Sequence, residues 1–268
     1  MSRLSSGRPG LRYQCHGEVG AEGLVFVNGL GAGLEGWFHQ QRFFSEFHRV
    51  LCFDNRGAGG SEVLDEPVTM RDFAQDLVHL LDELALERCA FVGLSFGARI
   101  LQELALGWPH RVRALVLGGS GCRTGGASAM PSPLRRVLGE GGDFSEESFL
   151  AELMPLIFGR TYLHSHARHL RVFARSIAAR PPDPRGLFRQ WEAHDGFDCC
   201  ARLAEIEAPV LVLHGEEDAL CSLESARQLA QGLPRGRLVE LAHVGHSPHV
   251  EAPLRFNRVV HDFLCNNP

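Results

Sequence analysis

A serine between two glycines, in Gly93-Leu94-Ser95-Phe96-Gly97, is the residue of this chain best placed to do chemistry. An apolar, β-prone run, 89–92, precedes it, and the run 98–105 that follows has a helical pattern. A Gly-x-Ser-x-Gly turn between a strand and a helix holds the serine in a strained conformation, with its Oγ exposed above the sheet. The small residues two before and two after the serine let strand and helix approach. The pattern alone is weak in a chain with 30 glycines, so its meaning depends on what surrounds it.

The partners that this serine needs are a histidine and a carboxylate. A serine hydroxyl is a poor nucleophile until a base takes its proton, and a carboxylate orients that base. Both should follow later strands, in the chain order serine, acid, histidine. The segment 214–218 offers acids and the segment 243–249 offers histidines. The candidates for the acid are Glu216, Glu217 and Asp218. The candidates for the base are His243, His246 and His249.

Short apolar runs that alternate with helical patterns must position these side chains. Such alternation indicates an α/β fold, with a mostly parallel sheet covered by helices on both faces. One helix is predicted to begin at Thr69, because Asp72 stands three residues on, as in a capping box. The other predicted elements are strands at 24–27, 50–53, 89–92, 114–117, 209–214 and 237–241, and helices at 98–105, 222–233 and 253–264.

The alternation stops between residues 122 and 198, where no buried strand is predicted. The stretch begins as a loop and then becomes helical. The first predicted helix has Asp143 as its candidate N-cap, Glu146 in the capping-box position and an apolar stripe over 149–157. Two more helices are predicted, at 163–179 and around 187–191. We interpret the stretch as a helical lid inserted after the strand at 114–117, which would be the sixth strand of the sheet, because long insertions at this edge of a sheet tend to carry specificity. The alternative is a small second domain with an unrelated role. The predicted division is 1–121 and 199–268 for the core and 122–198 for the cap.

Taken together, these landmarks resemble the α/β-hydrolase fold superfamily, from about residue 24 to residue 264. The segment 28–31 looks like the oxyanion loop of the family, and the segment 54–61 looks like its D-x-R-G-x-G-x-S turn. The elbow and the two later loops match as well. The resemblance implies that Ser95 is the nucleophile, Asp218 the acid and His246 the base.

The resemblance also implies an oxyanion hole made of two backbone N–H groups, those of Leu30 and Phe96. Asn28 stands where the family usually has a histidine. In the family, the side chain at this position mainly organises the loop. An asparagine there would change the geometry of the loop but would not remove the two N–H groups.

The implied reaction is hydrolysis of a carboxylic ester, lactone or thioester through an acyl-enzyme, without a cofactor or metal. The same residues also serve C–C bond hydrolysis and cofactor-free haloperoxidase or perhydrolase chemistry. The expected partner is a small apolar or aromatic acyl substrate, and the protein would be a monomer or homodimer. Candidate pocket residues are Asn28, Gly29, Phe149, Met154, Phe158 and Trp191, although those of the lid could equally pack only against each other.

A competing signal is the literal G-x-G-x-x-G at Gly31–Gly36, which follows a strand and precedes Asp54 by about twenty residues, as a dinucleotide site requires. It would make the protein a nicotinamide- or flavin-dependent oxidoreductase, but it leaves the serine, acid and histidine loops unexplained. A catalytically silent binding protein on the hydrolase fold is the third alternative.

The amino-acid composition argues against several other classes of function. All 27 basic residues are arginine, which excludes a Schiff-base lysine and a P-loop lysine, and the net charge of −5 argues against nucleic-acid binding. The amino terminus lacks the apolar stretch of a signal peptide, and no run is long enough to span a membrane. The eight cysteines contain no C-x-x-C pair, so we expect free thiols in the reducing cytoplasm and no disulfide.

Overall fold

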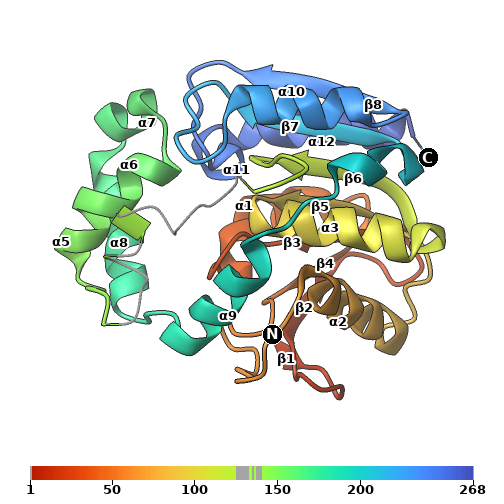
Figure 1. The fold of residues 1–268 in the computed structure, drawn as a ribbon, viewed down its shortest axis with the longest axis horizontal. Helices are drawn as coiled ribbons and strands as arrows, with labels where there is room; N and C mark the ends of the chain where they lie inside the picture. Colours follow the sequence, from red (N-terminus) through yellow and green to blue (C-terminus); the bar gives the residue numbers. More distant parts are fainter. Residues whose placement is uncertain (1, 125–132, 135, 137–140, 268) are drawn as a thin grey trace.

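The computed structural model describes residues 2–124, 133–134, 136 and 141–267. Part of the loop predicted at the start of the 122–198 stretch lies outside these residues. The centre of the fold is one sheet of eight strands in the order β1-β2-β4-β3-β5-β6-β7-β8 (Figure 1). The strands β3 to β8 are parallel, and β1 and β2 are antiparallel at one edge. Their bounds are β1 Arg3–Leu4, β2 Arg12–His16, β3 Gly23–Val27, β4 Arg49–Phe53, β5 Cys89–Leu94, β6 Val112–Gly118, β7 Val210–Gly215 and β8 Gly236–Leu241.

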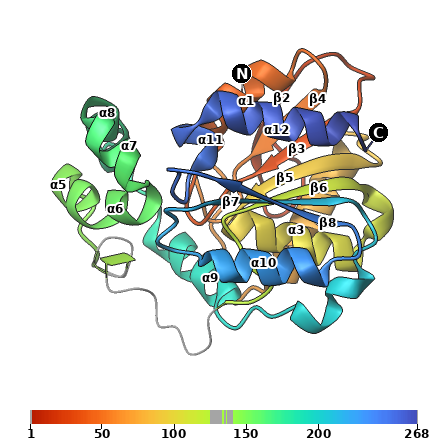
Figure 2. The same ribbon diagram turned by 90° about the horizontal axis from the view of Figure 1, so that it is seen from above.

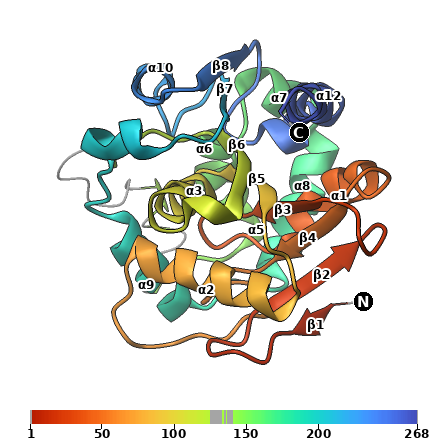
Figure 3. The same ribbon diagram turned by 90° about the vertical axis from the view of Figure 1, so that its right-hand side faces the viewer.

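Helices cover both faces of the sheet, as the sequence predicts (Figures 2 and 3). Helices α1, α11 and α12 lie on one face, and α2, α3 and α10 on the other. The capping box predicted for α2 is present: Thr69 Oγ1 accepts from the Asp72 N–H, and the Asp72 carboxylate accepts from the Thr69 N–H. The bounds are α1 Phe38–Phe44, α2 Met70–Glu83, α3 Phe96–Gly107, α10 Leu223–Gly232, α11 Pro248–Glu251 and α12 Pro253–Cys265.

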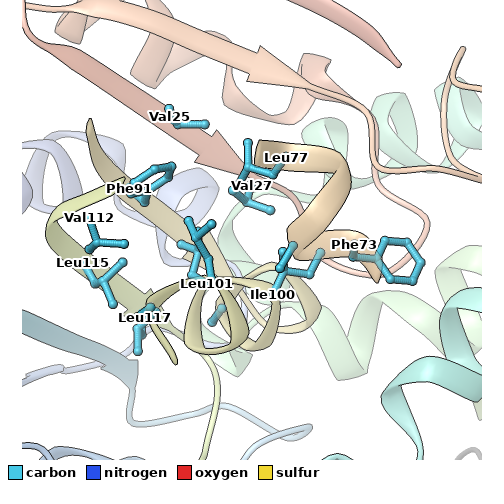
Figure 4. Close-up of a cluster of buried hydrophobic side chains, with 14 of the residues drawn as sticks. Val25, Val27, Phe73, Leu77, Phe91, Ile100, Leu101, Val112, Leu115 and Leu117 are labelled. Carbon is cyan, nitrogen blue, oxygen red and sulfur yellow. The ribbon is translucent and has the colours of Figure 1, made fainter. Parts of the chain in front are cut away.

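Alternation along the strands creates two apolar layers, one on each face of the sheet. In β3, Val25 and Val27 pack with α2 and α3, whereas Leu24 and Phe26 pack with α1 and α12. Figure 4 shows the first layer, where Phe73 and Leu77 of α2 and Ile100 and Leu101 of α3 gather against the strands. All four β3 residues are completely buried, which is typical of a parallel sheet covered on both sides.

The stretch between β6 and β7 is helical, as predicted, and most of it stands beyond one edge of the core (Figure 1). Helices α5 to α8 form this outlying group, and α9 leads back to the core. We call the helices α5–α9 the cap; its exact boundaries as a domain stay a prediction. The bounds are α5 Glu146–Ser148, a π-helical turn at Phe149–Leu153, α6 Met154–Ile157, α7 Arg160–Ser165, α8 Ala167–Ala178 and α9 Pro184–His194.

Three details of the cap differ from the prediction. The N-cap of the first helix is Ser145, whose Oγ accepts from the Ser148 N–H at 3.1 Å, because Asp143 instead accepts from the Ser145 N–H. That helix is broken by the π turn before Pro155, which has no N–H to continue the α-helical ladder. The helix predicted at 163–179 is two helices, because His166 has φ −124° and ψ 34° and stacks on Tyr162.

The expectation that every cysteine is a free thiol is wrong in this structure. Cys122 and Cys200 form a disulfide with a Cα–Cα distance of 5.0 Å. The two ends of the stretch between β6 and β7 meet here. The Cys199 N–H donates to the Cys122 carbonyl, and Arg123 pairs with Asp198 in an isolated β-bridge. A sequence separation of 78 residues hides this proximity from pattern reasoning.

Two glycines bring α3 against the sheet below Ser95. A Cβ at Gly97 would lie 2.3 Å from the Val27 carbonyl oxygen and 2.6 Å from that of Asn28. A Cβ at Gly93 would lie 2.7 Å from the Gly97 carbonyl oxygen. The contacts are to backbone atoms, which cannot rotate away, so the approach requires glycine at both positions.

We therefore predict that Gly97→Ala pushes α3 away from β3 and lowers the free energy of unfolding by roughly 1–3 kcal/mol, the usual cost of overpacking. Urea unfolding followed by circular dichroism measures the change. Gly7→Ala is the matched control, because a Cβ there meets nothing within 4 Å, and it should leave stability unchanged. Equal stability of the Gly97→Ala and Gly7→Ala proteins would contradict this account of the turn.

Candidate active site

Ser95 lies in a strained turn between β5 and α3. Its φ of 53° and ψ of −113° fall where residues with a side chain rarely stand. The surrounding structure holds it there, because its N–H donates to the Gly118 carbonyl at 2.8 Å and α3 begins at the next residue. Such strain at a polar residue is typical of functional sites. A Cβ at Gly29 would lie 3.7 Å from the Ser95 Cβ, so the loop after β3 passes directly beside the serine.

Asp218 and His246, on the loops after β7 and β8, form a buried pair. The His246 Nδ1 lies 2.8 Å from the Asp218 Oδ2, and the Asp218 side chain has no exposed surface. The other carboxylate oxygen accepts from the N–H groups of Leu220 at 2.8 Å and Cys221 at 2.9 Å. Burial alone would raise the pKa of Asp218, but His246 and these hydrogen bonds outweigh it and hold that pKa below its usual range. The carboxylate therefore stays ionised and fixes Nδ1, which leaves Nε2 to exchange a proton.

Ser95 and His246 lie beside two adjacent residues at the end of β6, Gly118 and Gly119. Gly118 accepts the Ser95 N–H, and a Cβ on Gly119 would lie 3.0 Å from the His246 Cε1 and Nδ1. Gly119 has φ +56°, so both its conformation and the imidazole require glycine there. Ser95, Asp218 and His246, which the resemblance singles out, thus all lie at the carboxyl edge of the sheet, around Gly118 and Gly119.

The rival acids and histidines lie elsewhere. Glu216 is exposed, while Glu217 accepts from the Thr161 N–H at 3.2 Å and faces His243 at 3.8 Å. His249 packs on Trp37 with ring centroids 4.6 Å apart, and burial lowers the pKa of His249 to about 3. None of the four makes a hydrogen bond to the Asp218–His246 pair within the described part of the chain.

Two backbone N–H groups beside Ser95 are free to bind an anion. Those of Leu30 and Phe96 have no acceptor in the part of the chain that the structure describes. Phe96 is the first residue of α3, where the helix leaves its N–H groups unsatisfied. Asn28 is 3% exposed and its Nδ2 lies 3.4 Å from the Phe53 carbonyl oxygen. This contact favours support of the loop over contact with a ligand.

Gln190 of the cap is a supporting residue that the sequence reasoning missed. Its Oε1 accepts from the Gly31 N–H and its Nε2 donates to the Arg56 carbonyl, both at 2.8 Å. Gln190 is completely buried, and α9 is therefore fastened to the loop that carries Leu30. A glutamine in a helix carries no sequence signal, because its role depends on two residues more than 130 positions away.

Glu251 is a second supporting residue without a sequence signal. Its carboxylate accepts from the N–H groups of Gly245 at 3.0 Å and Ser247 at 3.2 Å, which flank His246. It also accepts from the N–H of Gly159 in the cap at 2.8 Å. Burial raises the pKa of Glu251 although these three donors oppose the rise. One carboxylate therefore joins the cap to the histidine loop.

The G-x-G-x-x-G segment does not form a dinucleotide site here. Its residues Leu34–Trp37 form a 3-10 helix, and Asp54, the acid that such a site would offer to a ribose, is completely buried. Asp54 already accepts from the N–H groups of Leu34 at 2.6 Å and Gly60 at 2.8 Å and pairs with Arg12. Its carboxylate closes a turn and is not available to a ligand.

The lid residues predicted for a pocket divide into two groups. Phe149, Met154 and Phe158 are at most 2% exposed and pack inside the apolar cluster of the cap. That cluster reaches the core through Leu30 and other loop residues beside the site. Trp191 is half-buried on α9, with its ring 5.1 Å from that of His194.

Among the described residues, no group of three or more His, Cys, Asp or Glu side chains is arranged to hold a metal ion. No helix among them has the length and apolarity to cross a bilayer.

Comparison with known proteins places this architecture in a family. Residues 23–253 match the model of the alpha/beta hydrolase fold, and the chain belongs to that family.

The chain is 32% identical over 258 residues to a protein of Variovorax paradoxus provisionally named carbamate hydrolase RutD, covering 95% of this chain and 96% of the other. It is also 32% identical to 2-hydroxy-6-oxononadienedioate/2-hydroxy-6-oxononatrienedioate hydrolase 2 of Pseudomonas putida, over 95% of this chain and 91% of the other. The enol-lactonase of Burkholderia xenovorans LB400 superposes with a TM-score of 0.89 at 28% identity, covering 98% of this chain and all of the other. The predicted enzyme class, an α/β-fold hydrolase, is confirmed.

We predict that Gln190→Leu, which keeps the size of the side chain, loosens the Leu30 loop and lowers kcat/KM about tenfold. The reason is that the partly buried Gly31 N–H and Arg56 carbonyl lose their partners. An unsatisfied buried group costs roughly 1–3 kcal/mol, and partial burial puts each of these toward the lower end. Gln190→Glu, which still accepts from Gly31, should retain more activity than Gln190→Leu. Gln228→Leu, on the exposed face of α10, is the control. Equal kcat/KM for the Gln190→Leu and Gln228→Leu enzymes would refute the role of Gln190.

Proposed function

We propose that the protein is a serine hydrolase that cleaves a carboxylic ester, lactone or thioester through an acyl-enzyme on Ser95. The observation that carries this proposal is the buried Asp218–His246 pair beside the strained Ser95. Asp218 would orient His246, His246 would act as the base, and the N–H groups of Leu30 and Phe96 would form the oxyanion hole.

In the acylation step, the Ser95 Oγ attacks the carbonyl carbon of the substrate and its proton passes to the His246 Nε2. The carbonyl oxygen becomes an anion that accepts from the two N–H groups. Fixed donors of this kind cost no reorganisation during the reaction, and the loss of one typically costs about 10²–10³ in kcat. Asp218 stabilises the imidazolium that His246 becomes.

Collapse of the intermediate breaks the bond to the leaving group, which takes the proton from the His246 Nε2. A water molecule then gives a proton to the same nitrogen and attacks the acyl carbon. The second intermediate collapses to the free acid and returns the proton to Ser95. His246 thus serves once as base and once as acid in each half of the reaction.

Comparison with named relatives leaves the bond type open within this scheme. The Burkholderia relative is called an enol-lactonase, which favours a lactone or ester. The Variovorax relative is named for a carbamate and the Pseudomonas putida relative for an oxo-dienedioate, so carbamates and C–C bond hydrolysis remain candidates to assay. The family implies a small-molecule substrate; its apolar or aromatic character, the oligomeric state and a cytoplasmic location stay predictions.

The experiment that tests this proposal is labelling with a fluorophosphonate probe, together with hydrolysis of p-nitrophenyl esters, lactones and acyl thioesters. The wild-type protein should be labelled at Ser95. Ser95→Ala should abolish the labelling and lower kcat by a factor of about 10⁴ or more, because the nucleophile is lost. Ser176→Ala, at an exposed serine of α8, is the control and should behave as wild type.

Two results would count against the proposal. One is labelling that persists in Ser95→Ala. The other is a wild-type protein that resists the probe but binds a nicotinamide tightly, which would favour an oxidoreductase.

A further inference from the structure

Arg99 is a buried cation with no acidic partner. It lies in α3, four residues after Ser95, and is 7% exposed. Its Nη1 lies 3.2 Å from the Nδ1 of His194, and its Nε is buried without a partner. No carboxylate pairs with Arg99 in the part of the chain that the structure describes. Buried arginines are almost always paired, so this one requires an explanation.

The groups that face Arg99 do not compensate its charge. They are His194, Cys199 and Cys221. Burial raises the pKa of both thiols to about 12, so they are neutral near pH 7. Burial, with the charges of Arg99 and His246, lowers the pKa of His194 to about 3, so the imidazole is neutral too. The guanidinium is therefore left as an uncompensated positive charge.

Arg99 and His194 lie against the catalytic machinery proposed above. A side chain in a helix covers the turn before its own Cα, which for Arg99 is the turn that begins at Ser95. The His194 ring lies 6.2 Å from the ring of Phe96, the residue that offers an oxyanion N–H. His194 also shares one face of α9 with Gln190, which holds the Leu30 loop.

The protonation of His194 follows from its partner. A guanidinium only donates hydrogen bonds, so the Nδ1 that faces Arg99 accepts and the proton resides on Nε2. Neither the His194 Nε2 nor the Arg99 Nη2 has a hydrogen-bond partner among the described residues. Because the two ring nitrogens of an imidazole point in nearly opposite directions, His194 orients the guanidinium and does not share a ligand with it. The charged Nη2, without a partner among the described residues, suits an oxygen of a carboxylate.

We propose that Arg99, oriented by His194, binds a carboxylate group carried by the substrate, so that the enzyme prefers acyl substrates that are themselves anions. This inference rests on the proposed serine-hydrolase function and specifies its substrate class. Bound substrate would supply the negative charge that the protein omits around Arg99. Trp191 and the apolar residues of the cap would contact the chain between the carboxylate and the reacting carbonyl.

The test compares mono-p-nitrophenyl esters of linear dicarboxylic acids of increasing length with the same esters capped as methyl esters. At pH 7.5 the wild-type enzyme should show a higher kcat/KM for the free acid than for the capped ester at one or more lengths. Arg99→Met should lower the ratio of the two kcat/KM values by roughly 10- to 100-fold, the worth of a charge-assisted hydrogen bond. His194→Phe should lower it less, and Arg99→Lys should retain part of it.

Arg185→Met is the matched control, because Arg185 is an exposed arginine paired with Asp183, and it should leave the ratio unchanged. Thermal unfolding shows whether Arg99→Met folds; loss of an unpaired buried charge should not destabilise the protein.

Calorimetry on the Ser95→Ala protein, with the same ester pairs, tests the carboxylate preference without turnover. A wild-type enzyme that hydrolyses capped and free esters equally at every length, or Arg99→Met with an unchanged ratio, would overturn the carboxylate site while leaving the serine hydrolase intact. If the hydrolase proposal itself is wrong, the wild-type protein will not react with the probe and will hydrolyse neither ester. Calorimetry would then show on its own whether the protein prefers the free acid to the capped ester.

Discussion

The close approach of α3 to the sheet is the constraint on which the site depends. Gly97 meets the carbonyls of Val27 and Asn28, and Gly93 meets that of Gly97, so no side chain fits at either position. The chain can therefore turn sharply enough to hold Ser95 at φ 53°. The same approach brings the loop after β3 beside the serine and leaves the Phe96 N–H at a bare helix end. The positions of the proposed nucleophile and of the N–H proposed to bind the oxyanion thus have one physical origin.

The cap is fastened to the core by a few polar contacts at the two loops that chemistry requires. Gln190 holds the loop of Leu30, and Glu251 joins Gly159 of the cap to the residues that flank His246. Each contact ends on backbone groups of the core, so it constrains the loop whatever side chains the loop carries. A movement of the cap would therefore displace first the loop that carries Leu30 and the loop that carries His246.

Much of the arrangement could be predicted from sequence because its signals are local. The buried strands, the capping box at Thr69 and the Ser95, Asp218 and His246 loops all depend on neighbouring residues, and the structure has them where expected. The sequence does not predict the antiparallel strands β1 and β2, because neither contains a continuous apolar run. The roles of Gln190, Glu251 and Arg99 depend on contacts between distant segments, as does the Cys122–Cys200 disulfide, and periodicity contains no information on such contacts.

The central claim is a covalent acyl intermediate on Ser95, and mass spectrometry after rapid acid quenching tests it most directly. When wild-type protein is mixed with an activated ester and quenched within its first turnover, the peptide that contains Ser95 should gain the mass of the acyl group. The mass should disappear as the acid product is released. Product formation with no acyl group on that peptide at any time, or an acyl group on a different residue, would contradict the account.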